Sequence, residues 1–150
     1  MARLSMPKIT PFLWFDNNAQ EAVRFYVSIF KNAHIIELNP LVSSFELEGH
    51  RFMALNGGPA FKFTEAISFY ISCETQEEVD YYWDALLRDG GKESQCGWLK
   101  DTYGLSWQIV PTILSELLSN PDTKLSDKVM QAMLKMVKLD IAGLKKAGSK

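Results

Sequence analysis

An internal repeat constrains the architecture of this chain more than any other feature. The segment QEAVRFY, residues 20–26, aligns with QEEVDYY, residues 76–82, at an offset of 56 residues, and four of the seven positions are identical. An apolar, β-branched segment precedes each copy, and two or three such segments follow it. A repeat of this size is a supersecondary unit that buries its apolar face against a copy. We therefore predict an α+β fold of two βαβββ modules.

The first module is predicted over about residues 8–58. Its apolar segments and its helical periodicity predict five elements: a strand at 9–15, a helix at 19–30, and strands at 33–38, 42–47 and 51–55. The Asp16-Asn17-Asn18 break between the first strand and the helix supplies N-cap candidates.

The second module is predicted over about residues 65–111. Apolar and polar residues alternate along its first strand. One face carries Ile67, Phe69, Ile71 and Cys73, and the other carries Ser68, Tyr70 and Ser72. Thr75 and Glu78 form a capping box for a helix that runs to about Leu87. Segments 94–100 and 105–110, joined by a turn around 101–104, supply the remaining strands.

A helical tail is predicted over residues 112–150. Segment 112–118 favours a short helix, and segment 124–139 favours a longer amphipathic one that residues 140–144 extend. We interpret Met130, Met133 and Met136 as core-filling side chains rather than as a ligand or partner groove, since Met commonly fills gaps. With this tail, the whole of 1–150 is predicted to be a single domain.

Composition excludes several classes of protein. The chain has 150 residues and a formal net charge of -2, so it lacks the excess of cations that a nucleic-acid partner requires. Two cysteines, Cys73 and Cys96, are too few for a disulfide scaffold. The N-terminal segment lacks the apolar region of a signal peptide, and no apolar run is long enough to span a bilayer. We expect a cytoplasmic protein without a membrane partner.

Several short sequence motifs resemble those of the PhnB-like family of the vicinal oxygen chelate superfamily. This superfamily includes glyoxalase I, bleomycin-resistance proteins and extradiol dioxygenases. The motifs are FDNNAQEA at 15–22, FMALNGGP at 52–59, QCGWLKD at 95–101 and YGLSWQIVP at 103–111. The resemblance implies an open, cup-shaped sheet built from two modules, usually in a homodimer. Some members carry a label as a 3-demethylubiquinone methyltransferase.

The resemblance also implies where a metal would sit. Metal-dependent members place one His, Glu or Gln ligand on the first and one on the last strand of each module, which falls at about Thr10, Ala54, Ser68 and Gln108. Only Gln108 is a plausible ligand, and one neutral amide does not hold Zn²⁺ or Fe²⁺. We therefore expect no metal and no other cofactor. We interpret His34 and His50 as unrelated surface residues.

Other chemistry is weakly supported. The glycine-rich turn of a nucleotide-type cofactor site leads from a strand into a helix, whereas Gly57-Gly58-Pro59 leads into Ala60-Phe61-Lys62-Phe63. Cys96 lies beside Lys100, whose charge could activate a nucleophilic thiol, but we favour a packing role for it.

These observations favour a metal-free small-molecule binding protein. The predicted ligand-binding residues are Trp14, Ser68, Tyr70, Ser72, Cys96 and Gln108. Their hydroxyl, amide and indole groups suit a neutral planar or carbonyl-bearing ligand, with no full charge needed. The alternatives are a glyoxalase-like lyase or dioxygenase-like oxidoreductase, the ubiquinone-pathway methyltransferase of the family label, and an interaction protein that uses its tail.

Overall fold

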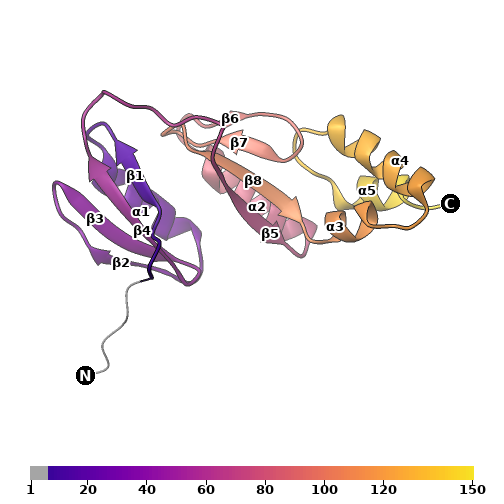
Figure 1. The fold of residues 1–150 in the computed structure, drawn as a ribbon, viewed down its shortest axis with the longest axis horizontal. Helices are drawn as coiled ribbons and strands as arrows, with labels where there is room; N and C mark the ends of the chain where they lie inside the picture. Colours follow the sequence, from indigo (N-terminus) through magenta and orange to yellow (C-terminus); the bar gives the residue numbers. More distant parts are fainter. Residues whose placement is uncertain (1–6) are drawn as a thin grey trace, which may run out of the picture. The chain divides into compact units, whose positions relative to one another are not determined.

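The chain forms two compact units, which a computed structural model describes over residues 7–150 (Figure 1). The first unit ends at Lys62 and the second begins at Phe63. Within residues 7–150, no helix is long and apolar enough to cross a membrane.

Each unit holds one βαβββ module, as the repeat predicts. The first contains β1 (Phe12–Phe15), α1 (Ala19–Ile29), β2 (Ala33–Glu37), β3 (Val42–Leu47) and β4 (His50–Asn56). The second contains β5 (Ser68–Cys73), α2 (Gln76–Leu87), β6 (Lys92–Glu93), β7 (Trp98–Lys100) and β8 (Ser106–Pro111). The strand orders, β1-β4-β3-β2 and β5-β8-β7-β6, are equivalent. The predicted α+β architecture is confirmed.

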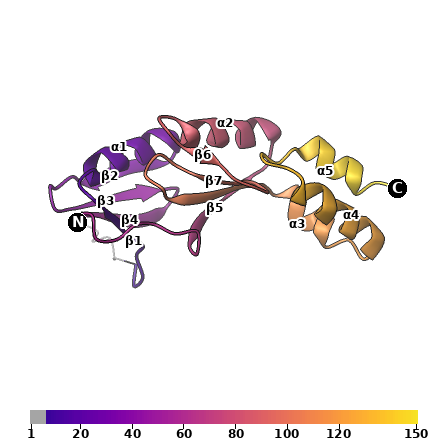
Figure 2. The ribbon, with the colours of Figure 1, turned by 90° about the horizontal axis from the view of Figure 1, so that it is seen from above.

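The residues that repeat in sequence are those that anchor each helix on its sheet. Val23 and Val79 are fully buried, and so, nearly, are Tyr26 and Tyr82. The Tyr26 ring stacks at 6.2 Å from Phe45 of β3. Figure 2 shows α1 and α2 each lying along one face of the sheet of its own unit. The repeat therefore reflects helix-on-sheet packing, the contact that each module needs for its core.

The helix α2 begins as the capping box predicts. The Glu78 N–H donates to Thr75 Oγ1 at 3.1 Å, and Glu78 Oε1 accepts from the Glu74 N–H at 2.7 Å. These contacts satisfy N–H groups that have no partner within the helix.

The prediction of one strand over 94–100 is wrong at its start. Residues 95–97 form a turn between β6 and β7, because Cys96 and Gly97 have positive φ angles of 59° and 86°. An extended strand cannot contain such residues.

The tail also differs from the prediction, because its long helix is divided. It contains α3 (Ile113–Leu118), α4 (Thr123–Leu134) and α5 (Ile141–Ala147). The carbonyl oxygens of Met136 and Val137 accept from the N–H groups of Cys96 and Gly97, both at 2.8 Å, so this stretch leaves the helical path. Asp140 then caps a new helix by accepting from the Gly143 N–H. The tail forms its own core with Val110, Leu114, Val129, Leu139 and Leu144.

The three predicted core methionines have different environments. Met133 and Met136 are partly buried and pack against this core, which confirms the prediction for them. Met130 is exposed, because it lies on the outer side of α4. The core-filling interpretation is therefore wrong for Met130.

Gln76 clamps the tail onto the second module. Its Nε2 donates to the Leu139 carbonyl at 3.1 Å, and its Oε1 accepts from the Ile141 N–H at 2.7 Å. The Lys138 ammonium lies 2.9 Å from the Asp80 carboxylate, and this contact raises the pKa of Lys138. Figure 1 shows α3, α4 and α5 gathered at one end of the second sheet.

Substitution of Gly97, compared with Gly104, is predicted to separate the cost of steric crowding from that of backbone strain. An alanine Cβ at Gly97 would lie 2.9 Å from Leu139 Cδ1 and 2.9 Å from the Ile109 carbonyl, whereas one at Gly104 meets nothing within 4 Å. Both glycines have a positive φ. Gly104→Ala should cost about 1 kcal/mol of unfolding free energy, and Gly97→Ala roughly 1–3 kcal/mol more.

Urea denaturation of the two variants beside the wild-type chain measures this difference. Equal losses for both substitutions would show that neither Leu139 nor the Ile109 carbonyl crowds an added Cβ at position 97.

Candidate functional site

The two faces of the second sheet have different environments. Strand alternation directs Cys73, Leu99, Trp107 and Ile109 toward α2, and all four are buried. On the opposite face, which we call the open face, the tail covers the end of β8 at Val110, but no helix among the described residues of the second unit covers Tyr70, Gln108 and Trp98 (Figure 2). A ligand can therefore reach this sheet from one side only.

Strand register brings three side chains into one row across the open face. Gln108 is the direct partner of Tyr70 on one side and of Trp98 on the other. Directly paired residues of adjacent strands share a face and lie close together. Tyr70 is 57% exposed, and Gln108 and Trp98 are half-buried. This open-face row combines two aromatic rings with an amide.

Ser68 fixes the Gln108 amide. Gln108 Nε2 donates to Ser68 Oγ at 3.0 Å, and this bond leaves the amide oxygen and the second N–H for other partners. Ser72 lies on β5 with Ser68, is exposed, and is the register partner of Val110. The sequence prediction placed Ser68, Tyr70, Ser72 and Gln108 on one face, and strand register brings them together.

The predicted turn after β7 is held by a buried carboxylate. Asp101 Oδ1 accepts from the N–H groups of Tyr103 and Leu105, and its Oδ2 accepts from Trp107 Nε1 at 2.9 Å. Asp101 therefore fixes β7 against β8 and holds Trp107 on the covered face, away from the open-face row.

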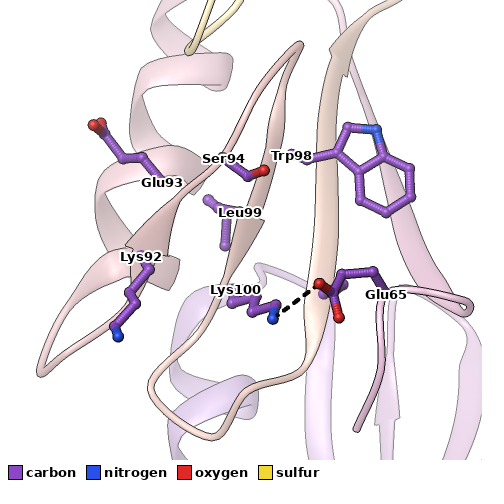
Figure 3. Close-up of a pocket in the computed structure, with 8 residues that line it drawn as sticks. Glu65, Lys92, Glu93, Ser94, Trp98, Leu99 and Lys100 are labelled. Carbon is purple, nitrogen blue, oxygen red and sulfur yellow. Dashed lines mark ion pairs between the residues drawn. The ribbon is translucent and has the colours of Figure 1, made fainter.

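A depression of about 150 Å³ lies at the edge of the second sheet where β6 and β7 pair (Figure 3). It is lined by Glu65, Lys92, Glu93, Ser94, Trp98, Leu99, Lys100 and Ser106. The Lys100 ammonium lies 3.2 Å from the Glu65 carboxylate, and hydrogen bonding from Lys100 lowers the pKa of Glu65 below its usual range. Both side chains are well solvated, so this ion pair adds little to stability.

Ser106 contributes an unusual polar group to the depression. The residue is only 1% exposed, and its Oγ has no hydrogen-bond partner in the described part of the chain. A buried hydroxyl without a partner has given up its hydrogen bonds to water without forming one in the protein, which costs free energy. Such a group is a candidate for contact with a ligand.

Trp14 lies in the first unit, on β1. Its Nε1 donates to the Gly58 carbonyl at 2.9 Å, and its ring meets Phe61 edge-on at 4.9 Å. A Cβ on Gly57 would overlap the indole, so the small residue at this position makes room for the ring. No helix follows Gly58 before α2, as expected. The Gly57-Gly58 pair is thus explained by the packing of Trp14.

The two thiols have different environments. Burial, reinforced by the charge of Glu78, raises the pKa of Cys73 to about 12, so this thiol stays protonated in the sheet core. Cys96 is half-buried in the turn before β7, and its N–H is bonded to the tail. The structure thus places Cys96 against the tail segment, away from the register of the open-face row.

Register corrects the positions at which a metal would sit. The direct partners Phe12–Met53 and Ser68–Ser106 occupy equivalent places in the two modules, so Leu55 is the counterpart of Gln108. The predicted position Ala54 is wrong, because it is fully buried on the face that packs against α1. Thr10 precedes β1, and the counterpart of Ser68 is Phe12.

The corrected set does not fit a divalent metal. Phe12 and Leu55 carry no donor atom, and a hydroxyl and an amide remain. No group of three or more His, Cys, Asp or Glu side chains suited to a metal occurs among residues 7–150. His34 and His50 lie on β2 and β4, with β3 between them.

Several residues of this region were not among the predicted site residues. Trp98 and Lys100 alternate on β7, and this pattern could have placed them on the face of Gln108. Ser106 alternates with Gln108 on β8, so the sequence could have placed it on the same face, but not at the depression. Glu65 carries no local signal, because only the packing of the segment before β5 brings it there.

Comparisons with known proteins agree with this fold. A family model described as 3-demethylubiquinone-9 3-methyltransferase matches residues 7–110. A solved structure from Bacillus cereus, described as a proposed 3-demethylubiquinone-9 3-methyltransferase and PhnB protein, is 35% identical with a TM-score of 0.64, and covers 71% of this chain and 100% of its own. No curated protein matches.

Two more distant structures show the fold alone. Protein PA1353 from Pseudomonas aeruginosa is 18% identical with a TM-score of 0.57, and covers 70% of this chain and 96% of its own. A glyoxalase-related enzyme from Fulvimarina pelagi is 13% identical with a TM-score of 0.52, and covers 72% and 91%.

A matched pair of serine substitutions is predicted to distinguish the unpartnered hydroxyl from an ordinary one. Ser43 is also 1% exposed, but its Oγ accepts from the Asn39 N–H and donates to the Asn39 carbonyl. Ser43→Ala should cost about 1–2 kcal/mol of unfolding free energy because it leaves the Asn39 groups unpaired, whereas Ser106→Ala should be neutral or stabilising by about 1 kcal/mol.

Thermal and urea unfolding of both variants provide the measurement. A loss at Ser106 as large as that at Ser43 would show that the Ser106 hydroxyl has a partner in the folded protein.

Proposed function

This chain belongs to the PhnB-like family of the vicinal oxygen chelate superfamily, and we propose that it is a small-molecule binding protein that works without a metal. The proposed site is the open face of the second sheet, with Tyr70, Gln108, Ser68 and Ser72 from the predicted set, joined by Trp98. The proposed ligand is planar and bears a carbonyl group.

The observation that carries this proposal is the open-face row. Rings at both ends of the row offer stacking surfaces, and the amide between them has a fixed orientation because Ser68 accepts one of its N–H groups. The hydroxyl of Tyr70 and the remaining N–H of Gln108 can both donate to a ligand carbonyl. A few oriented polar groups among apolar ones are typical of small-molecule sites.

Trp14 is proposed to serve the first sheet in the same way. It occupies the place of Tyr70 in the repeat, and its N–H is already bonded to Gly58, so it would supply ring stacking without a hydrogen bond. Cys96 is proposed to contribute through its turn, which sets the start of β7 and hence the position of Trp98.

The enzyme alternatives have less support in the residues. Glyoxalase-like and dioxygenase-like chemistry polarises substrate oxygens with a metal, and the donor set at the equivalent positions does not hold one. The family label names methyl transfer, but Gly57 and Gly58 are explained by their contacts with Trp14. The cytoplasmic location and the single domain over 1–150 stay predictions.

Titration with benzamide, a neutral planar carbonyl compound, tests the proposed site. We expect a dissociation constant of about 1 mM, which is usual for so small a ligand, with shifts of the Trp98 and Gln108 side-chain NMR signals. Gln108→Ala should weaken binding about fivefold through loss of one hydrogen bond, while the unfolding free energy stays nearly constant.

Gln131→Ala, on the exposed side of α4, is the matched control and should not change binding. Benzamide shifts that avoid the second sheet, or affinity unchanged in Gln108→Ala, would contradict the proposed site.

We further propose a homodimer in which the partner covers the face of the first sheet that lies opposite α1, around Phe12. Phe12 is 51% exposed there, and Val42, Met53 and Leu55 are half-buried on the same face. An apolar sheet face of this kind is commonly covered by a partner.

Light scattering at micromolar concentration should give about twice the 17.0 kDa of one chain. Phe12→Glu should shift the protein toward 17.0 kDa, whereas Tyr81→Glu, at an exposed ring on α2, should not. A wild-type mass of 17.0 kDa would rule out the dimer.

A further inference from the structure

We infer that the depression at the β6 edge is an anion subsite, and that the ligand of the open face is a planar carboxylic acid whose carboxylate is bound by Lys92, Lys100 and Ser106. This inference rests on the proposed function, because the ring of the ligand would occupy the open-face row.

The charges at this edge are arranged for an anion. Lys92 and Lys100 are direct cross-strand partners, and like charges in that relation repel. Glu65 pairs with Lys100, and Figure 3 shows Lys92 and Lys100 projecting from neighbouring strands, with the ion pair joining Lys100 to Glu65. The charge of Glu65 offsets only part of the repulsion between Lys92 and Lys100, and a bound carboxylate would reduce what remains.

Glu93 does not cancel this charge. Although it borders the depression, its Oε2 accepts from Trp83 Nε1 at 2.9 Å on the α2 side of the sheet. In Figure 3 its carboxylate points away from Lys100 and Glu65.

The buried hydroxyl of Ser106 is an independent observation that points to a ligand. Ser106 is the direct partner of both Lys100 and Ser68, so it lies between the lysine pair and the serine that orients Gln108. Ser106 lines the depression, and its buried hydroxyl has no hydrogen-bond partner among residues 7–150. A carboxylate oxygen accepts strongly from O–H and N⁺–H donors together, and would satisfy this group.

The size of the depression and its neighbours define the class of ligand. Trp98 lines the depression and also begins the open-face row, so one molecule can contact both. The volume of about 150 Å³ is below the roughly 300 Å³ of sites that enclose a whole drug-sized ligand. It suits an acid group at one end of a ring system that extends toward Gln108.

Glu65 has a distinct part in this arrangement. Its carboxylate already occupies one side of Lys100, and its side chain is two-thirds exposed. An incoming carboxylate therefore competes with an exposed group that can move into solvent. Removal of the Glu65 charge should strengthen anion binding, an effect that a purely structural ion pair would not produce.

Benzoate and benzamide, which differ in charge but hardly in shape, provide the test. We expect benzoate to bind the wild-type chain about tenfold more tightly than benzamide at constant ionic strength. Lys92→Gln and Ser106→Ala should each weaken benzoate several-fold and leave benzamide unchanged, and Glu65→Gln should strengthen benzoate alone. Lys124→Gln, an exposed lysine at the start of α4, is the control for net charge.

The outcomes separate the two proposals. Equal affinities for the two probes, or benzoate binding that Lys124→Gln weakens as much as Lys92→Gln does, overturn the anion subsite while benzamide binding keeps the open-face site. Benzoate binding that depends on Lys92 and Ser106 but not on Gln108 supports the subsite and counts against the proposed function. Absence of binding by both probes overturns both.

Discussion

The parallel pairing of the first and last strands of each module is the contact on which the rest of the structure depends. Parallel neighbours cannot be joined by a tight turn, so the chain must cross over one face of the sheet, and here α1 and α2 make those crossovers. A single helix per module covers a single face. The open face therefore follows from topology, and it is the face on which β5 and β8 present Tyr70 and Gln108 side by side.

Much of this fold could be predicted from sequence, because the helix residues that pack against the two sheets repeat. Val23 with Val79 and Tyr26 with Tyr82 identify both crossovers, and alternation along β5 identifies the face of Tyr70. The register between β1 and β4 does not follow from the sequence to one residue, so the predicted metal position falls at Ala54 and not at Leu55. A slip of one residue reverses the face. The end of α4 also escaped prediction, because the carbonyl of Met136 is engaged by a turn about 40 residues earlier in the chain.

The two modules keep the same core and differ on their open faces. Equivalent places carry Phe12 and Ser68, Trp14 and Tyr70, and Leu55 and Gln108. The first sheet is apolar at each of these places and the second is polar or amphipathic. An apolar face suits contact with protein and a polar one suits recognition of a small molecule, so one architecture supports the two different surfaces on which the proposed dimer and the proposed site depend.

The clamp at Gln76 makes the stability of the tail partly independent of the stability of the second sheet. Its two hydrogen bonds link residues that are separated by 63 and 65 positions in the sequence, so each closes a long loop at a cost in chain entropy. The core of α3, α4 and α5 instead joins residues that are mostly close together in the sequence. Release of the tail would break the Gln76 bonds and the bonds from Cys96 and Gly97 to Met136 and Val137, but it would not break a strand of the second sheet. The tail is thus suited to be a separate cooperative unit, one that exchanges its amide hydrogens sooner than β8 and transmits its attachment to the start of β7.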